Sequence, residues 1–127
     1  FSSKLYRVIF QSNRAIRLLS SSNASPRVLY EKEGAIATIT INRSVVKNAV
    51  DRDTAAELAD RLREFDADNE IKAGVLVGSG GTFCAGADLK AIHEGKYNRL
   101  EDEGDAPMGP SRFELSKPLI AAISGFA

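Results

Sequence analysis

The hydrophobic and polar positions of this chain follow two different periods, and each period predicts a different kind of element. Between Ala35 and Asn42 two faces alternate residue by residue and β-branched side chains dominate, which predicts a strand. The short apolar run Val28–Tyr30 predicts a strand before it, with Glu31–Gly34 as the turn of a hairpin. After Asp51, a good helix N-cap, apolar residues recur every three or four positions, which predicts an amphipathic helix that ends at residues 67–70. Its expected buried face is Ala55, Leu58, Ala59, Leu62 and Phe65.

Two later apolar runs, Ile71–Val77 and Leu119–Ser124, predict buried strands. Between them we expect a short helix from Leu89 to about residue 94, a surface loop over residues 95–110, and one helical turn over residues 111–116. The order strand, strand, helix, strand implies an α/β layered domain with a right-handed crossover. Ligands of such domains bind beyond the carboxyl ends of the strands.

The stretch Gly78–Lys90 follows one of these strand ends and holds four glycines in its first nine residues. Glycine has no Cβ, so it adopts unusual backbone angles and lets a ligand approach the main chain. A bend that opens a helix presents free N–H groups, which suit a phosphate, a carboxylate or a developing oxyanion. Taken alone, Gly78–Gly81 is more often a plain turn. A dinucleotide-binding fingerprint fits poorly, because Phe83 stands where its third glycine belongs.

Composition narrows the function classes. The 127 residues allow one domain, and 43% hydrophobic with 27% charged residues is typical of globular proteins. Residues 1–30 hold five of the 17 basic residues and none of the 17 acidic ones, so the remainder carries 12 basic against 17 acidic residues. An acidic body argues against nucleic acid as a partner, and no apolar run reaches the roughly 18 residues of a membrane span. The single cysteine, Cys84, excludes an internal disulfide.

Residues 1–26 are rich in Arg and Ser and free of acidic residues. On a helical wheel the apolar residues share one side and the basic residues share the other, with Phe10 as an exception. This makeup predicts a mitochondrial transit peptide with a Ser-rich linker, and hence a protein of the mitochondrial matrix whose body starts at residue 27. A structural or membrane-surface amphipathic helix is the alternative.

Three segments of the chain carry a more specific signal when they are taken together. They are Asn42-Arg43 with Asn48-Ala49-Val50, then Thr82–Lys90, then Lys117–Ala127. In order and spacing they resemble the enoyl-CoA hydratase (crotonase) superfamily, over about residues 28–127. The resemblance implies the α/β crotonase-like β-β-α spiral fold, of which only the N-terminal repeats are present here, and relatives that form trimers or hexamers. It also implies acyl-CoA substrates, no metal, and no cofactor other than the coenzyme A that the substrate carries.

The resemblance further implies an oxyanion hole of two backbone N–H groups that stabilises a thioester enolate while water adds to a 2-enoyl-CoA. Ala87 N–H would be the first donor, and loss of one such donor typically removes about 3 kcal/mol of transition-state stabilisation. Lys47 and Lys90 would also meet the CoA phosphates. The residues that would bind CoA are Val46, Lys47, Ala49, Ala85, Ala87, Asp88, Leu89 and Lys90.

The chain departs from the family in length. The family's second oxyanion donor and its catalytic carboxylates lie beyond the segment that matches Gly125-Phe126-Ala127. We therefore expect an N-terminal fragment that does not turn over substrate by itself and whose last strand leaves an unpaired edge. Other reactions of the superfamily stay open, namely enoyl-CoA isomerisation, carnitinyl-CoA dehydration and acyl-CoA hydrolysis. A non-catalytic CoA-binding homologue is a further alternative.

Three residues with reactive side chains have plainer interpretations. Cys84 has no His or Asp partner close in sequence, which favours a small packed thiol over a nucleophile. His93 is the only histidine, so a multi-histidine metal site is excluded and a surface position is expected. Asp88 stands at a helix start, which favours a cap or a loop hydrogen bond over a general base.

Overall fold

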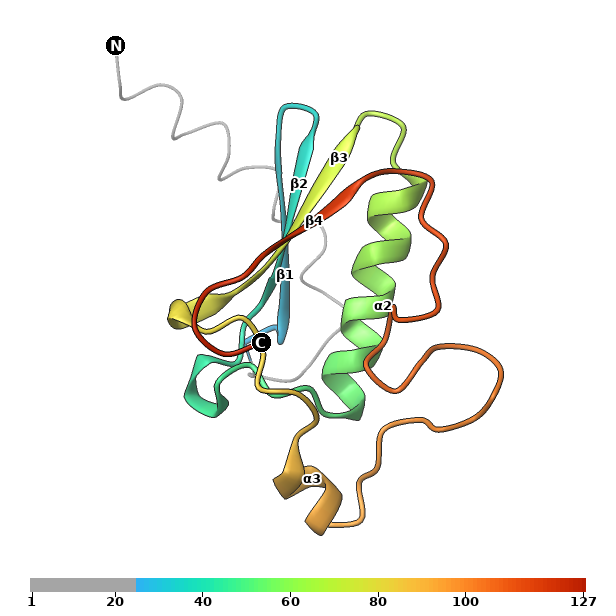
Figure 1. The fold of residues 1–127 in the computed structure, drawn as a ribbon. Coiled ribbons are helices and arrows are strands. Elements are labelled where there is room, and N and C mark those ends of the chain that lie inside the picture. Colours follow the sequence, from blue (N-terminus) through green and yellow to red (C-terminus); the bar gives the residue numbers. More distant parts are fainter. Residues whose placement is uncertain (1–24) are drawn as a thin grey trace.

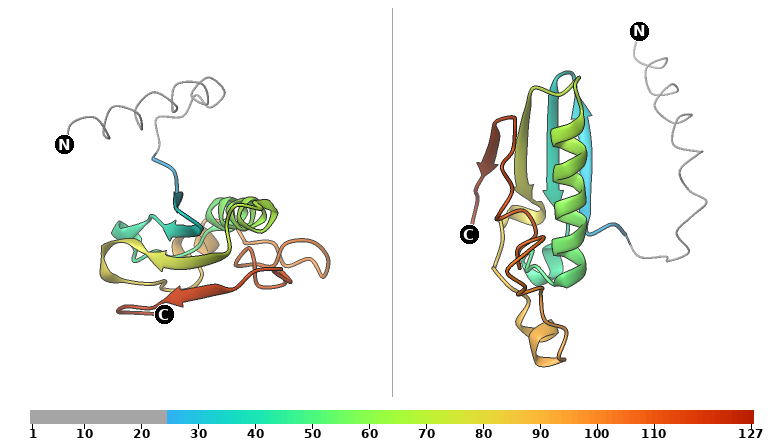
Figure 2. Two further views of the ribbon diagram at one scale, coloured as in Figure 1. Left: turned by 90° about the horizontal axis from the view of Figure 1, so that it is seen from above. Right: turned by 90° about the vertical axis from the view of Figure 1, so that its right-hand side faces the viewer.

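The computed structural model describes residues 25–127, and these residues form one mixed sheet with a long helix against one of its faces (Figure 1). The strand order is β1-β2-β3-β4; β1 and β2 are antiparallel, and the other two pairs are parallel. Figure 2 shows from two further sides that the sheet and helix α2 lie as two layers, with β4 at the edge of the sheet. The elements are β1 (Val28–Glu33), β2 (Ile36–Ile41), η2 (Ser44–Val46), α2 (Arg52–Ala67), β3 (Ala73–Gly78), η3 (Ser79–Gly81), α3 (Leu89–His93) and β4 (Leu119–Ala122).

The predicted hairpin is confirmed, but its turn is shorter than expected. Strand β1 runs through Glu33, which pairs with Ile36, so the turn consists of Gly34 and Ala35 alone. Gly34 has a φ of 58°, a left-handed angle that glycine adopts without strain. The charged residues 31–33 extend the strand because β1 is an edge strand, where side chains can stay in water while the backbone pairs.

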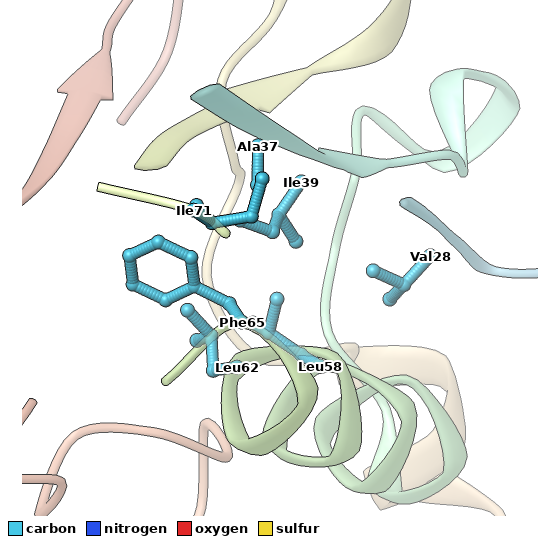
Figure 3. Packing of buried hydrophobic residues seen from close by; sticks show 7 residues of the cluster. All are labelled: Val28, Ala37, Ile39, Leu58, Leu62, Phe65 and Ile71. Carbon is cyan, nitrogen blue, oxygen red and sulfur yellow. The ribbon is translucent and has the colours of Figure 1, made fainter. Parts of the chain in front are cut away.

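Helix α2 begins and packs as its sequence predicts. Asp51 is the N-cap, and its Oδ1 accepts hydrogen bonds from Thr54 N at 2.9 Å and from Thr54 Oγ1 at 2.6 Å. The five residues of the predicted apolar face are all buried. In Figure 3 the side chains of Leu58, Leu62 and Phe65 lie against the sheet layer. The core cluster of buried residues is Val28, Ala37, Ile39, Leu58, Leu62, Phe65 and Ile71.

Three expectations about the second half of the chain were wrong or too generous. The strand after α2 starts at Ala73; Ile71 precedes it and is buried in the core instead. The predicted helical turn over residues 111–116 is absent, and a Phe113 N–H to Pro110 O hydrogen bond of 2.8 Å closes a simple turn there. Strand β4 is not buried: only Leu119 is partly covered, and Ile120 is 62% exposed, because α2 packs mainly over β1 and β2 at the other side of the sheet.

Residues 1–24 lie outside the described part of the chain, and with them almost all of the predicted transit peptide. Within residues 25–127 no helix is both long enough and apolar enough to cross a membrane.

Candidate functional site

Two loops meet at the carboxyl edge of the sheet. Residues 42–50 follow β2 and residues 79–88 follow β3, and these two strands are parallel neighbours. The last residues of the chain follow β4, the next parallel strand, at the same edge. Because parallel strands end together, the three segments that resembled one family in sequence are brought side by side, where α/β proteins bind their ligands.

Backbone hydrogen bonds join the first two loops in register. Ala85 N donates to Lys47 O at 3.0 Å, Val50 N donates to Gly86 O at 2.8 Å, and Asp88 N donates to Val50 O at 3.0 Å. The last two bonds make Val50 and Ala87 partners in an isolated parallel bridge. In such a bridge Val50 bonds to the residues on either side of Ala87, so the N–H of Ala87 points away from Val50. Ala87 is exposed, and none of the hydrogen bonds described for residues 25–127 uses its N–H.

The side chain of Asn48 locks the same two loops together. It is fully buried, and its Oδ1 accepts from Arg43 N at 2.9 Å. Its Nδ2 donates to Ser79 O at 2.8 Å and to Thr82 O at 2.6 Å. Asn48 has a φ of 57°, a left-handed angle that asparagine tolerates better than most residues. One amide thus serves three backbone groups of two loops that are more than 30 residues apart.

Glycine is required where β3 meets this amide. A Cβ at Gly78 would lie 2.1 Å from Thr82 O and 2.7 Å from Asn48 Nδ2, so only glycine fits under the loop. Gly86, with a φ of 86°, is needed for its backbone angle instead, since nothing lies within 4 Å of its Cβ position.

The segment after β4 closes the other side of the glycine-rich loop. Phe83 N donates to Ser124 O at 2.7 Å, and Cys84 N donates to Phe126 O at 3.0 Å. The Lys47 ammonium lies over the Phe126 ring, 4.7 Å from its centroid. All three loops are therefore in direct contact.

A half-buried guanidinium links the starts of the two helices. Arg43 pairs with Asp51, the N-cap of α2, at 3.1 Å and with Asp88, the N-cap of α3, at 3.0 Å. Asp88 Oδ1 also accepts from Lys90 N at 3.1 Å and from Ala91 N at 3.2 Å. Burial opposes the ionised form of Asp88, but the Ala91 N–H and Arg43 outweigh it and hold its pKa below the ordinary value of 3.8. Asp88 is therefore an ionised cap, as its sequence position favours.

Of the other predicted site residues, some lie in the two joined loops and others lie on α3. Lys47 and Ala85 are joined by a backbone hydrogen bond, and Ala49 is buried at 8% exposure. Leu89 is 77% exposed, and Lys90 and Val46 are exposed as well. No described contact joins Leu89 or Lys90 to the loop of residues 42–50, so these two belong to α3 rather than to the joined loops.

Arg43 and Asn48 contribute most of the side-chain contacts between the loops, yet neither was among the predicted site residues. Their signal in the sequence was the shared spacing of Asn42-Arg43 and Asn48-Ala49-Val50 alone. Cys84 is half-buried and its Sγ accepts from Gly86 N at 3.3 Å, while His93 is exposed at the end of α3. Within residues 25–127 no group of three His, Cys, Asp or Glu side chains is placed to hold a metal ion.

Comparison with known proteins identifies the family. The family described as "Enoyl-CoA hydratase/isomerase" matches residues 31–127, and the chain belongs to it. The chain is 39% identical over 105 residues to "Short-chain-enoyl-CoA hydratase" of Clostridium acetobutylicum, covering 79% of this chain and 40% of that protein. It is 35% identical over 97 residues to "Probable enoyl-CoA hydratase 1, peroxisomal" of Arabidopsis thaliana (76% and 36%) and 34% identical over 130 residues to "3-hydroxyisobutyryl-CoA hydrolase, mitochondrial" of Danio rerio (98% and 34%).

Solved structures confirm the crotonase fold of the N-terminal part. Enoyl-CoA hydratase EchA1 from Mycobacterium marinum superposes with a TM-score of 0.72 at 43% identity, over 81% of this chain and 40% of that one. A carnitinyl-CoA dehydratase from Mycobacterium avium 104 superposes with a TM-score of 0.70 at 40% identity, over 80% and 40%. The chain thus spans about 40% of the length of these relatives, and it forms the mixed α/β sheet of their N-terminal part.

Proposed function

We propose that Ala87 N–H is one donor of an oxyanion hole for an acyl-CoA thioester, and that the whole protein adds water across the 2,3 double bond of a 2-enoyl-CoA. The observation that carries this proposal is the Val50–Ala87 bridge, whose two hydrogen bonds hold the loop while the Ala87 N–H points away from Val50. A fixed donor stabilises negative charge on the thioester oxygen without reorganising during the reaction. Polarising that carbonyl makes C3 of the enoyl group electrophilic, so the oxygen of water bonds to C3 while the π electrons move to the thioester oxygen as an enolate. A proton then goes to C2 and the carbonyl re-forms.

We propose that the exposed surface around this donor binds the coenzyme A part of the substrate, which brings the only cofactor-like group the reaction needs. Lys47 and Ala85 are joined by a backbone hydrogen bond in the loops that carry the donor. Ala49 is buried, so we assign it a role in shaping the loop and not in contacting CoA. Lys47 and Lys90 are both exposed, which leaves their ammonium groups free to reach phosphate oxygens of CoA in this proposal. Val46, Asp88 and Leu89 are assigned to the rest of the proposed CoA-binding surface.

Activation of the attacking water needs a carboxylate that Asp88 does not provide. Asp88 is 8% exposed, accepts two backbone N–H groups and pairs with Arg43, so both carboxylate oxygens are engaged. These contacts lower its pKa, which makes it a weaker base than an ordinary carboxylate. We therefore propose that residues 1–127 expressed by themselves bind the thioester but do not hydrate it, and that the whole protein supplies the base.

The decisive experiment pairs calorimetry with a hydration assay. Titration of residues 1–127 with CoA and with crotonyl-CoA is expected to give saturable binding, and incubation is expected to leave the conjugated enoyl absorbance unchanged. The whole protein is expected to bleach that absorbance. Hydration by residues 1–127 above the buffer rate contradicts the assignment of the base, and absence of any CoA binding by the whole protein contradicts the function itself.

Two alternatives have support of their own. A carnitinyl-CoA dehydratase is among the similar structures, and dehydration and isomerisation use the same enolate stabilisation. Thioester hydrolysis would use the same donor for the oxyanion of a tetrahedral intermediate. A non-catalytic CoA-binding homologue is favoured by the full occupation of Asp88, and binding without turnover by the whole protein would establish it. Product analysis by mass spectrometry after incubation with crotonyl-CoA and with carnitinyl-CoA separates these reactions.

We also propose a mitochondrial matrix location and a trimeric or hexameric assembly for the whole protein. The Arg-rich, acid-free composition of residues 1–26 and the mitochondrial relative from Danio rerio support the location, while the Arabidopsis thaliana relative carries a peroxisomal name. Import of a fusion of residues 1–30 to a fluorescent protein tests the location. Light scattering of the whole protein tests the assembly.

A further inference from the structure

We infer that Arg43 is a positioning residue for the proposed oxyanion donor, which it serves by cancelling the charge of Asp88, the residue next to Ala87. This inference rests on the proposed function of Ala87. The Arg43 side chain is 16% exposed, and its guanidinium contacts Asp51, Asp88 and the carbonyl of Ala49. The guanidinium itself has no proposed contact with substrate, so Arg43 acts through the residues that it holds in place.

The three contacts lie on both sides of the bridge between Val50 and Ala87. The Ala49 carbonyl precedes Val50, and the Asp88 carboxylate follows Ala87, the two partners of the bridge. Arg43 Nη1 donates to both, while Nη2 reaches Asp51. A planar guanidinium can hold three oxygens in one fixed arrangement, which a lysine ammonium on a flexible stem does not reproduce.

Electrostatics gives the arrangement a consequence for the reaction. Asp88 is ionised, and its carboxylate directly follows the donor at which negative charge is proposed to develop. An unpaired carboxylate there would repel the enolate oxygen. Among the described residues, Asp88 forms an ion pair with Arg43, whereas Asp51 also forms one with Arg27. Loss of Arg43 therefore leaves the charge of Asp88, more than that of Asp51, uncompensated next to the donor.

The test measures carbonyl polarisation directly. A 2-enoyl-CoA with an aromatic conjugated acyl group absorbs at longer wavelength when its thioester carbonyl is polarised, so the red shift on binding reports the donor, and the titration midpoint reports CoA affinity separately. The variants are Arg43→Gln, Asp88→Asn and the double replacement. An asparagine in place of Asp88 retains the ability to cap α3. Arg61→Gln is the matched control, because Arg61 pairs with Glu64 on the exposed face of α2, away from the site.

The charge account and a purely structural account predict opposite results for Asp88→Asn. If Arg43 acts by cancelling charge, Arg43→Gln loses most of the red shift, Asp88→Asn increases it, and the double variant regains the larger part of it. Affinity for CoA itself is expected to change less than about threefold in Arg43→Gln, since the guanidinium has no proposed contact with CoA and solvent screens charges at a distance. If Arg43 only braces the loops, both single replacements diminish the red shift and the double variant does not recover it, which overturns the inference.

The outcomes also separate the inference from the function on which it rests. A wild-type protein that binds the ligand without a red shift refutes the oxyanion role of Ala87 and the inference with it. A wild-type red shift that survives unchanged in Arg43→Gln overturns the inference and leaves the proposed function standing. If Arg43→Gln fails to fold by circular dichroism, Asp88→Asn decides alone, because an increased red shift supports the inference and a decreased one overturns it.

Discussion

Replacing Asn48 by alanine is expected to destabilise the fold by about 4 kcal/mol. The amide makes three hydrogen bonds to backbone groups, with Arg43 N, Ser79 O and Thr82 O. Each such bond contributes about 1 kcal/mol net, and a buried group left without a partner costs somewhat more, so about 3 kcal/mol is expected from their loss. The left-handed φ of 57° adds about 1 kcal/mol for alanine.

Two further replacements separate these contributions. Asn48→Gly removes the same bonds but tolerates the left-handed angle, so it is expected to destabilise by about 3 kcal/mol. Asn48→Asp keeps the acceptor for Arg43 N but sets a carboxylate oxygen against Ser79 O and Thr82 O, now 2.8 and 2.6 Å from Nδ2. At neutral pH it is therefore expected to be at least as damaging as alanine, with partial recovery in acid, where a protonated carboxyl can donate to one carbonyl.

Urea unfolding followed by circular dichroism measures these effects, and hydrogen exchange at the amides of Ala85 and Val50 reports whether the two loops separate first. The control is Asn69→Ala, an exposed position in the turn after α2, which is expected to change stability by less than about 0.5 kcal/mol. A loss below about 1 kcal/mol for Asn48→Ala, or exchange at Ala85 that is no faster than in the wild type, would refute the assignment of Asn48 as the lock between the loops.

Three other predictions concern the frame of the site. Gly78→Ala forces a Cβ to within 2.1 Å of Thr82 O, so a loss of about 3 kcal/mol is expected in urea unfolding, and a near-neutral result would show that the loop yields. Leu62→Ala removes a fully buried side chain and is expected to cost about 2–5 kcal/mol by thermal unfolding without changing the red shift of bound ligand; a changed red shift contradicts the separation of core and site. Burial opposes ionisation of Asp51 and Asp88, but their hydrogen bonds and ion pairs hold both pKa values below 3.8 in the folded protein. On acidification the unfolded chain therefore takes up protons first. The stability that these groups contribute is full above about pH 5 and falls as the pH approaches the lower folded pKa values. In Asp88→Asn the urea midpoint is expected to fall less steeply with decreasing pH than in the wild type. An unchanged dependence of the midpoint on pH would contradict this role of Asp88.

Much of the frame is written in the local pattern of the chain. The alternation of Ala35–Asn42 and the spacing from Ala55 to Phe65 predict β2 and α2, because burial on one face depends only on which neighbours share that face. Asp51 is recognisable as a cap for the same reason, since its partner Thr54 lies three residues away. Element ends are less local, and β1 runs on through Glu33 because its backbone partners lie on β2 rather than next to it in sequence.

The burial of β4 and the turn over residues 111–116 show where an apolar pattern is not enough. The run Leu119–Ser124 is apolar throughout most of its length, but an apolar side chain is buried only where another layer covers it, and residues 25–127 provide one layer on one face. Within residues 111–116, Phe113 and Leu115 pack against the core cluster, and Ser116 N donates to Asp66 Oδ1 on α2 at 2.8 Å. Tertiary contacts replaced the helical turn there.

By itself, the sequence determined the family, the α/β order of the elements and the stretch of chain that carries the proposed donor, because these depend on residue type and on spacing over a few turns. Only the tertiary structure decided that Arg43 spans Asp51 and Asp88, that Asn48 joins two loops, and that the N–H of Ala87 points away from Val50. The physical reason is that these contacts join residues up to 45 positions apart, and many of them end on backbone carbonyls. A carbonyl is present at every residue, so no side-chain pattern marks the ones that will be used.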